Sequence, residues 1–210
     1  MLQLYYYPKN ASLAPHLVLE HLNKNFELLL VDRDNQQQKS PAYLALNPAG
    51  RIPTLIHDDL VIFESSAICL YLCEQHPEST LIPKLGEQDR AHFYQWLMYL
   101  NNTVQSEFLV YFYPEKYTME KGCEASIIES QEIRLMAMFD LLDKKLNGES
   151  FLVGNQITVC DYFLLMVSIW GRNLPKPALS YQNLGPYLEN LAKQKVVRKV
   201  FQREKISLTG

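Results

Sequence analysis

The sequence predicts a mixed α/β domain at the N-terminus followed by an all-helical domain. Short strand-like and helix-like segments alternate in the first third of the chain. The stretch from Pro77 to Gly86 then holds two prolines in PESTLIPKLG and no periodicity, and every long segment after it has helical spacing. We therefore predict a first domain over residues 1–78 and a helical domain over residues 87–210.

The first segments predict a strand, a helix and a second strand. Leu2 to Tyr6 is an apolar and aromatic run that stops at Pro8, which is typical of a short strand. Residues 12–23 carry leucines at amphipathic helix spacing. The continuous apolar run over residues 26–31 predicts a strand buried on both faces. Together these segments form a βαβ unit.

The rest of the first domain predicts a short helix, a hairpin and a longer helix. Ser40-Pro41 places proline at the first position of a helix that ends near Asn47. Strands follow at residues 54–57 and 60–62, joined by a turn at Asp58-Asp59, and a helix is expected over residues 65–75. The order of elements in this domain is therefore βαβ-α-ββα.

The second domain predicts helices over residues 87–112, 122–146, 158–171 and 184–203, the last as two short helices. Thr158 and Asp161 have the spacing of a capping box at the start of the third of these helices.

Composition limits the function classes. The net charge of −3 gives no reason to expect nucleic acid or an anionic membrane as a partner. The N-terminus lacks the pattern of a signal peptide, and no apolar run reaches the roughly 18 residues of a membrane span. We expect a cytoplasmic protein. Its four cysteines form no C-x-x-C pair and no metal-ligand spacing, which predicts reduced, mostly buried thiols and no metal site.

Five motifs in order resemble those of the cytosolic glutathione transferases over nearly the whole chain. They are LYYYP (4–8), SLAPH (12–16), NPAGRIPTL (47–55), FESSAI (63–68) and TVCD (158–161). The resemblance implies a thioredoxin-like N-terminal domain, glutathione as co-substrate, no metal, and a homodimer. The N-terminus is most similar to the bacterial beta class, whose cysteine is replaced here by Ala11, and whose His and Lys are replaced by Gln105 and Ser106.

The resemblance implies that Ile52 and Pro53 bind the glutathione backbone. An X-Pro bond adopts the cis form at a cost of only about 0.5–1 kcal/mol. A cis bond here would turn the backbone groups of Ile52 away from the sheet, so that they could pair with the cysteinyl unit of glutathione as an added strand.

Glu64 and Ser65 are expected to bind the γ-glutamyl end of glutathione. Ser65 would cap the following helix, and the amides at that end attract a carboxylate. Glu64 would pair with the ligand's ammonium group. Arg51 and Lys39 are the candidates for the glycine carboxylate, with Arg51 favoured.

A free thiol has a pKa of about 8.5, so a transferase must stabilise the thiolate. The resemblance implies that the donor comes from the end of the first strand or the loop after it. Tyr6, Asn10 and Ser12 are the candidates, and the sequence does not decide between them. With alanine at position 11, a mixed disulfide through a protein cysteine is excluded there, and a hydrogen-bonded thiolate is predicted.

The electrophile is expected to be small and hydrophobic, and to bind against the helical domain. Tyr99, Asn102, Tyr111 and Tyr113 are the candidate pocket residues. Other glutathione-dependent reactions of the same fold, namely isomerisation, dehalogenation and disulfide reduction, remain alternatives. A non-enzymatic adaptor of the stringent-starvation type is a further alternative, although His76-Pro77-Glu78 departs from the Pro-His-Pro motif of that group.

Overall fold

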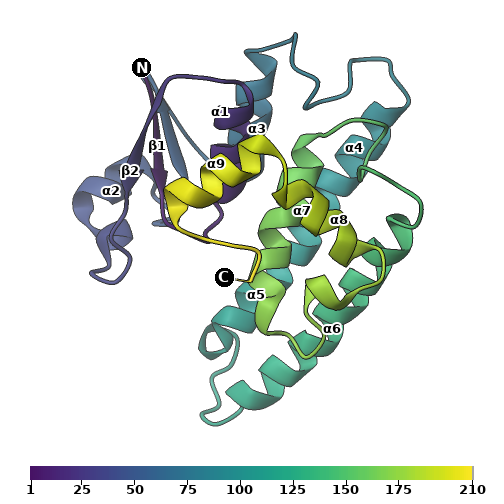
Figure 1. Ribbon diagram of the computed structural model, residues 1–210. Coiled ribbons are helices and arrows are strands. Elements are labelled where there is room, and N and C mark those ends of the chain that lie inside the picture. The colour runs from purple at the N-terminus through teal and green to yellow at the C-terminus, as the bar shows by residue number, and fades with distance from the viewer. Residues whose placement is uncertain (210) are drawn as a thin grey trace.

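The computed structural model describes residues 1–209 and consists of a small sheet with helices followed by an array of helices (Figure 1). The strands are β1 Leu2–Tyr6, β2 Phe26–Leu30, β3 Thr54–His57 and β4 Leu60–Phe63, in the order β2-β1-β3-β4. β1 is parallel to β2 and antiparallel to β3, and β3 is antiparallel to β4. With the helices below, this confirms the thioredoxin-like order βαβ-α-ββα.

Three helices belong to this part: α1 Leu13–His21, α2 Pro41–Leu46 and α3 Ser65–Glu74. Leu4 of β1 lies in the main core with residues of α1 and α3. On the other face of β1, Tyr5 and Tyr7 pack against a separate small cluster of Val31, Tyr43 and Ile52. Alternate residues of β1 therefore face different clusters, as the period of a strand requires.

The helical part contains α4 Asp89–Met98, α5 Gln105–Phe112, α6 Glu124–Lys145, α7 Val159–Trp170, α8 Leu184–Ala192 and α9 Lys195–Glu204. Short 3₁₀ turns lie at Gln37–Lys39, Pro114–Lys116, Gly171–Asn173 and Ala178–Ser180. The predicted helix over 87–112 is interrupted by a π-helical segment, Tyr99–Val104, between α4 and α5. The prediction of two short helices after residue 184 is confirmed.

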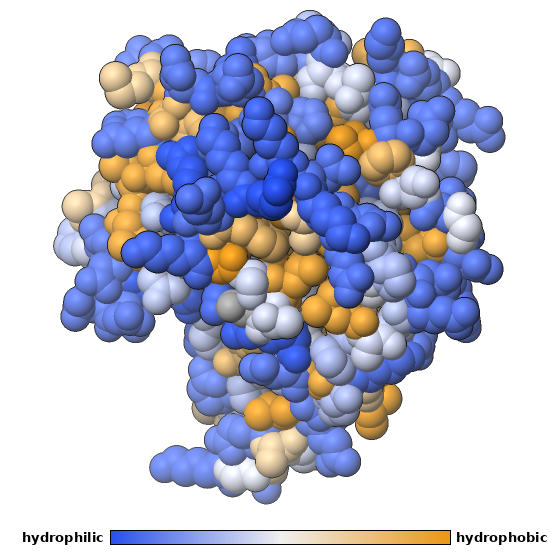
Figure 2. Space-filling view, in the orientation of Figure 1, coloured by the Kyte–Doolittle hydropathy of each residue, from blue (hydrophilic) through white to orange (hydrophobic). Residues whose placement is uncertain are grey.

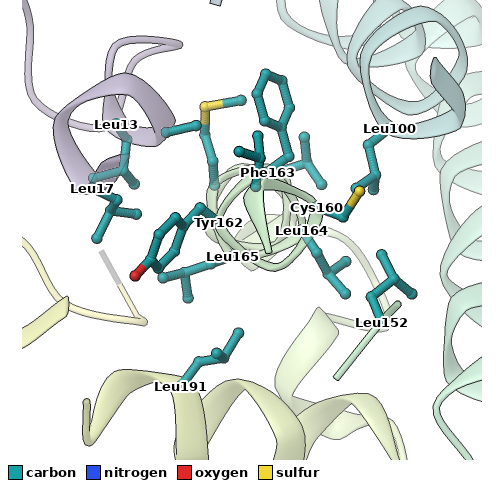
Figure 3. Packing of buried hydrophobic residues seen from close by; sticks show 14 of the residues in the cluster. Leu13, Leu17, Leu100, Leu152, Cys160, Tyr162, Phe163, Leu164, Leu165 and Leu191 are labelled. Carbon is teal, nitrogen blue, oxygen red and sulfur yellow. The ribbon is translucent and has the colours of Figure 1, made fainter. Parts of the chain in front are cut away.

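Helix α7 is the centre of the core, and all of its residues are buried. Figure 3 shows Leu13 and Leu17 of α1 on one side of α7 and Leu191 of α8 on another. One continuous cluster therefore includes residues from both parts of the chain. The segment between α3 and α4 also packs into this cluster. Its Leu81 is buried, and the Leu81 carbonyl accepts a hydrogen bond from the Val159 amide at 2.9 Å.

The capping box of α7 is confirmed. The Thr158 amide donates to Asp161 Oδ2 at 2.6 Å, and the Thr158 hydroxyl donates to the same oxygen at 2.9 Å. The other carboxylate oxygen of Asp161 accepts from the Leu152 amide at 2.9 Å and from the Tyr187 hydroxyl. Asp161 thus joins the start of α7 to the preceding loop and to α8.

Helix α9 lies across α1 (Figure 1), and Figure 2 shows strongly hydrophilic side chains over this region. Its inner face carries Glu204, whose Oε1 lies 2.7 Å from His16 Nδ1 with both side chains fully buried. Nearby, the nearly buried Glu20 of α1 pairs with Lys199 and Arg203 of α9. The C-terminal helix is therefore fixed to the first helix of the chain by the buried side chains of His16, Glu20 and Glu204 and their partners.

The prediction that the strand at 26–31 is buried on both faces is wrong. β2 is at the edge of the sheet, and Leu30 is 56% exposed. An apolar run alone cannot distinguish a central strand from an edge strand. Three of the four free cysteines, Cys69, Cys73 and Cys160, are buried as expected. No helix within residues 1–209 is long and apolar enough to cross a membrane.

Candidate functional site

The loop before β3 is held by the side chains of Tyr43, in α2, and Asn47, the residue that follows α2. Asn47 is 1% exposed, and its Nδ2 donates to the carbonyls of Arg51 at 2.8 Å and Pro53 at 3.4 Å. The Tyr43 hydroxyl donates to the same Arg51 carbonyl at 2.8 Å. Gly50 has φ +58°, a left-handed conformation that glycine adopts without strain. These contacts fix the backbone that leads to Ile52.

The Ile52-Pro53 bond is cis, which confirms the expectation from the sequence. The Ile52 side chain is 7% exposed and packs with Val31 and Tyr43. Within residues 1–209, the amide and carbonyl of Ile52 have no backbone hydrogen-bond partner. A rigid backbone with free donor and acceptor groups is suited to pair with an extended peptide.

Arg51 lies in this loop and Lys39 reaches it from the preceding 3₁₀ turn, and both are exposed. Lys39 Nζ donates to the Ala49 carbonyl at 3.4 Å, so the side chain lies over the loop. The Arg51 guanidinium makes no hydrogen bond or ion pair to another of the described residues. Of the two, Arg51 is the cation more available to an anionic ligand.

Glu64 has an unusual backbone at the start of α3. Its φ of +74° and ψ of 115° are rare for a residue other than glycine, and such conformations cluster at functional sites. Its side chain is exposed. The first backbone bond of α3 runs from the Ile68 amide to the Glu64 carbonyl at 2.9 Å. The amides at the start of the helix are therefore free of helical partners and favour an anion.

Ser65 is the first residue of α3 and not its cap, so the predicted capping role is wrong. Its Oγ donates to the Ala11 carbonyl at 2.7 Å, and the bond is buried. The hydroxyl is thus bonded to the loop after β1 and not to the amides of its own helix. This hydrogen bond brings the start of α3 beside the candidate thiol-activating residues.

In the loop after β1, Asn10 and Ser12 have different environments. The Ser12 side chain is buried, and its hydroxyl donates to the Tyr7 carbonyl at 3.2 Å and accepts from the Tyr7 amide at 3.3 Å. Asn10 Oδ1 accepts from the Ala11 amide at 2.8 Å, whereas Asn10 Nδ2 has no partner among the described residues. Asn10 therefore has donors to offer a ligand, and Ser12 is already used by the protein.

Tyr6 lies on the opposite face of β1 from Tyr5 and Tyr7. It packs against the main core, with its ring 6.3 Å from that of His16. Burial raises the pKa of Tyr6, and the negative charge of Glu204 raises it further while Arg203 opposes the change. Its surroundings are α1 and α9, and it does not join the cluster around Ile52.

The four candidate pocket residues have separate surroundings. Tyr99 packs edge-on against Trp96, with the ring centres 5.6 Å apart. Asn102 Nδ2 lies 3.8 Å from Met98 Sδ. Tyr111 packs against Phe112. Tyr113 is the one of the four with a direct hydrogen bond to the N-terminal part among residues 1–209, through Arg33 Nη2 at 2.8 Å.

Two residues of the site were not predicted from the sequence as site residues. The Trp170 indole donates to the Lys9 carbonyl at 2.8 Å, which ties the end of α7 to the loop that carries Asn10. Arg33 bridges to Tyr113 and lies over the Tyr7 ring. Both contacts join residues at least 80 positions apart, so no local pattern could have indicated them. Residues 1–209 contain no cluster of side chains that could hold a metal ion.

Comparisons with known proteins agree with this geometry. Residues 1–74 match the model of the glutathione S-transferase N-terminal domain, and residues 101–195 match that of the C-terminal domain. Glutathione S-transferase GST-4.5 of Xanthomonas campestris is 27% identical over 97% of this chain and 98% of its own length.

Two solved structures are also similar to this chain. A glutathione S-transferase from Xylella fastidiosa is 25% identical, with a TM-score of 0.89 over 99% of this chain and all of the other. A sphingomonad glutathione S-transferase complexed with glutathione is 26% identical, with a TM-score of 0.84 over 98% of this chain and all of the other. Because the two family models together match more than half of the chain, the protein belongs to the glutathione S-transferase family.

Proposed function

We propose that this protein conjugates glutathione to a small hydrophobic electrophile, and that the side-chain amide of Asn10 stabilises the glutathione thiolate. The observation that carries the proposal is the hydrogen bond from Ser65 to the Ala11 carbonyl at 2.7 Å. It brings the anion-favouring start of α3 next to the loop whose Asn10 has a free donor. The start of α3 and Asn10 can therefore bind the same glutathione molecule, one at its peptide part and the other at its thiol.

Each part of glutathione has a proposed partner. The free backbone groups of Ile52, before Pro53, bind the cysteinyl unit, as the lack of internal partners supports. The amides at Ser65 bind the γ-glutamyl carboxylate, and Glu64 binds its ammonium group. Arg51, assisted by Lys39, binds the glycine carboxylate. The relative complexed with glutathione supports this co-substrate.

Asn10 is the best supported of the three candidate thiolate donors. A thiolate needs one or two good donors to lower the thiol pKa, and each pKa unit corresponds to about 1.4 kcal/mol. Ser12 already exchanges hydrogen bonds with Tyr7, and Tyr6 packs on the other face of β1. The reaction would then form a carbon–sulfur bond to the electrophile while its leaving group departs with the electron pair.

Tyr99, Asn102, Tyr111 and Tyr113 remain the proposed lining of the electrophile pocket, with Phe112 and Trp170 as its apolar wall. Phe112 is 44% exposed, and its ring lies 6.4 Å from that of Trp170, which in turn bonds to the loop of Asn10. An apolar surface beside the proposed thiolate position favours an aromatic acceptor.

We also propose that two copies of the chain form the homodimer typical of the family. Apolar side chains are exposed on two elements, namely Leu60, Val61 and Phe63 of β4 and Tyr94 and Met98 of α4. In a two-fold dimer, each of these surfaces could cover the other on the partner. The free thiols support a reducing compartment such as the cytoplasm.

The proposal is tested by calorimetric titration of glutathione, followed by a conjugation assay with a neutral aryl halide. We expect binding at millimolar concentration or tighter, and release of chloride with formation of the thioether. No binding would refute the proposal as a whole. Binding without turnover on any acceptor would refute the enzymatic part and favour the adaptor function.

A further inference from the structure

Arg33 follows β2 and reaches across to the helical part of the molecule. Its Nη2 donates to the Tyr113 hydroxyl at 2.8 Å, and its Cζ lies 5.3 Å from the centre of the Tyr7 ring. Tyr7 packs against the cluster that contains Ile52. The guanidinium is therefore held between the end of β1 and the end of α5, beside the proposed glutathione site.

The charge of Arg33 is not balanced by the protein. No carboxylate oxygen lies within 4.0 Å of its guanidinium in residues 1–209. The nearby Asp32 is engaged by Asn35, which donates to it from Nδ2 at 2.7 Å and from its amide at 3.1 Å. A partly buried guanidinium with a phenol as its partner retains N–H donors that match a carboxylate.

Tyr113, the hydrogen-bond partner of Arg33, has a second cation beside it and follows an exposed apolar residue in the chain. Lys116 Nζ lies 4.0 Å from the centre of the Tyr113 ring, which adds a second positive charge. Phe112, the residue before Tyr113, is 44% exposed, and the centre of its ring lies 6.4 Å from that of Trp170. A molecule that fits both features has an aromatic body and an anionic group.

We propose that Arg33 binds a carboxylate on the electrophile, so that this transferase prefers aromatic acceptors that carry an acid group. The inference rests on the proposed function. Arg51 and Lys39, in and beside the loop before Pro53, are left for the glycine carboxylate of glutathione. In the reaction with a chloroarene, sulfur bonds to the ring carbon, chloride leaves with the electron pair of the broken bond, and the thiol proton passes to solvent.

The test compares two acceptors with the same leaving group, a neutral chlorodinitrobenzene and the corresponding chlorodinitrobenzoate. The value of kcat/KM is measured for both with the wild type, Arg33→Gln, Arg33→Lys and Arg198→Gln. Arg198 is exposed on α9 and is a matched control for the loss of one positive charge. Arg33→Lys keeps the positive charge but removes the paired N–H donors of the guanidinium. It replaces Arg33→Gln as the test variant if Arg33→Gln folds poorly.

We expect the wild type to prefer the benzoate. Arg33→Gln should lower the ratio of kcat/KM for the benzoate to that for the neutral acceptor about tenfold, the effect of one charge-assisted hydrogen bond. Arg33→Lys should lower it less, and Arg198→Gln should leave it unchanged.

Two results would overturn the inference while the proposed function stands. One is an unchanged ratio in Arg33→Gln with normal turnover of the neutral acceptor. The other is an equal rise in the KM for glutathione with both acceptors, which would assign Arg33 to glutathione itself. If the wild type turned over neither acceptor, the proposed function would fail, and this inference with it.

Discussion

The indole nitrogen of Trp170 donates a hydrogen bond to the Lys9 carbonyl at 2.8 Å, across 161 positions of the sequence. Lys9 has φ +59°, a left-handed conformation that costs free energy in a residue other than glycine. The end of α7 thus helps to hold the loop that carries Asn10, the proposed thiolate donor. This contact ties the helical half of the molecule to the loop of the proposed thiol-activating site.

Trp170→Phe should lower kcat about five- to tenfold, because it removes one hydrogen bond of roughly 1 kcal/mol while keeping the ring contacts with Phe108 and Phe112. The KM for glutathione should change little, since the Ile52 and Ser65 groups remain. Steady-state kinetics with both substrates varied measures the two effects. Trp96→Phe is the matched control, because Trp96 packs on Tyr99 without an indole hydrogen bond to the described residues. Equal losses in the two variants would contradict the positioning role.

Glu204→Ala should lower the free energy of unfolding by about 1–3 kcal/mol, because it leaves the buried His16 Nδ1 without its hydrogen-bond partner. His16 and Glu204 are both fully buried, and their side chains lie 2.7 Å apart. Urea denaturation followed by circular dichroism measures the change. Glu189→Ala on α8, where the glutamate is exposed, is the control and should have little effect. A loss for Glu204→Ala as small as that of the control would show that the pair does not hold α9.

Glu20 should give the protein a stability that depends on pH. Burial alone would raise the pKa of Glu20, but the hydrogen bonds and charges of Lys199 and Arg203 outweigh it and hold the pKa below its ordinary value. The folded state therefore binds a proton at Glu20 less tightly than the unfolded state does. The stability that Glu20 contributes is present above its unfolded pKa of about 4.3 and is lost as the pH falls through its folded pKa.

The measurement is the difference in unfolding free energy between the wild type and Glu20→Gln from neutral pH to about pH 3, a window that spans the ordinary glutamate pKa of about 4.3. We expect the wild type to be more stable than Glu20→Gln by a constant amount near neutral pH. This difference in unfolding free energy should shrink as the pH falls below about 4.3. Glu129→Gln, on an exposed position of α6, should show no such trend. An advantage that grew as the pH fell would have the wrong sign for this account.

Phe63→Glu should convert the proposed homodimer to a monomer at micromolar concentration. Phe63 is 38% exposed on β4, and a charge placed there would be buried against the partner. Light scattering after size-exclusion chromatography gives the mass directly. Met119→Glu is the control, since Met119 is fully exposed in the connection between α5 and α6. A wild-type protein that runs as a monomer would refute the proposed dimer.

Local sequence patterns predicted most elements of the fold because their causes are local. Pro8 ends β1, Ser40 accepts a hydrogen bond from the Tyr43 amide as the cap of α2, and Asp161 closes the capping box of α7. The π-helical segment after α4 has no such signal, and the edge position of β2 follows from the strand order and not from its composition.

The site was predictable only where a motif is contiguous. Ile52-Pro53 was identified with its cis bond, whereas Ser65 was assigned to its own helix because the Ala11 carbonyl is 54 positions away. Arg33 and Trp170 gain their roles from partners 80 and 161 positions away. The proposal of Asn10 over Tyr6 and Ser12 likewise rests on the hydrogen bonds that already occupy Ser12 and on the face of β1 on which Tyr6 lies.

The most direct test of the central claim is the pH titration of the thiol of bound glutathione, followed by the ultraviolet absorbance of the thiolate. In the wild type, we predict a thiol pKa well below the value of about 8.5 for a free thiol. In Asn10→Ala, the pKa should return toward the free value, with glutathione affinity retained, while Ser12→Ala and Tyr6→Phe should keep the low value. A bound thiol that titrates like free glutathione in the wild type, or an unchanged pKa in Asn10→Ala, would contradict the account.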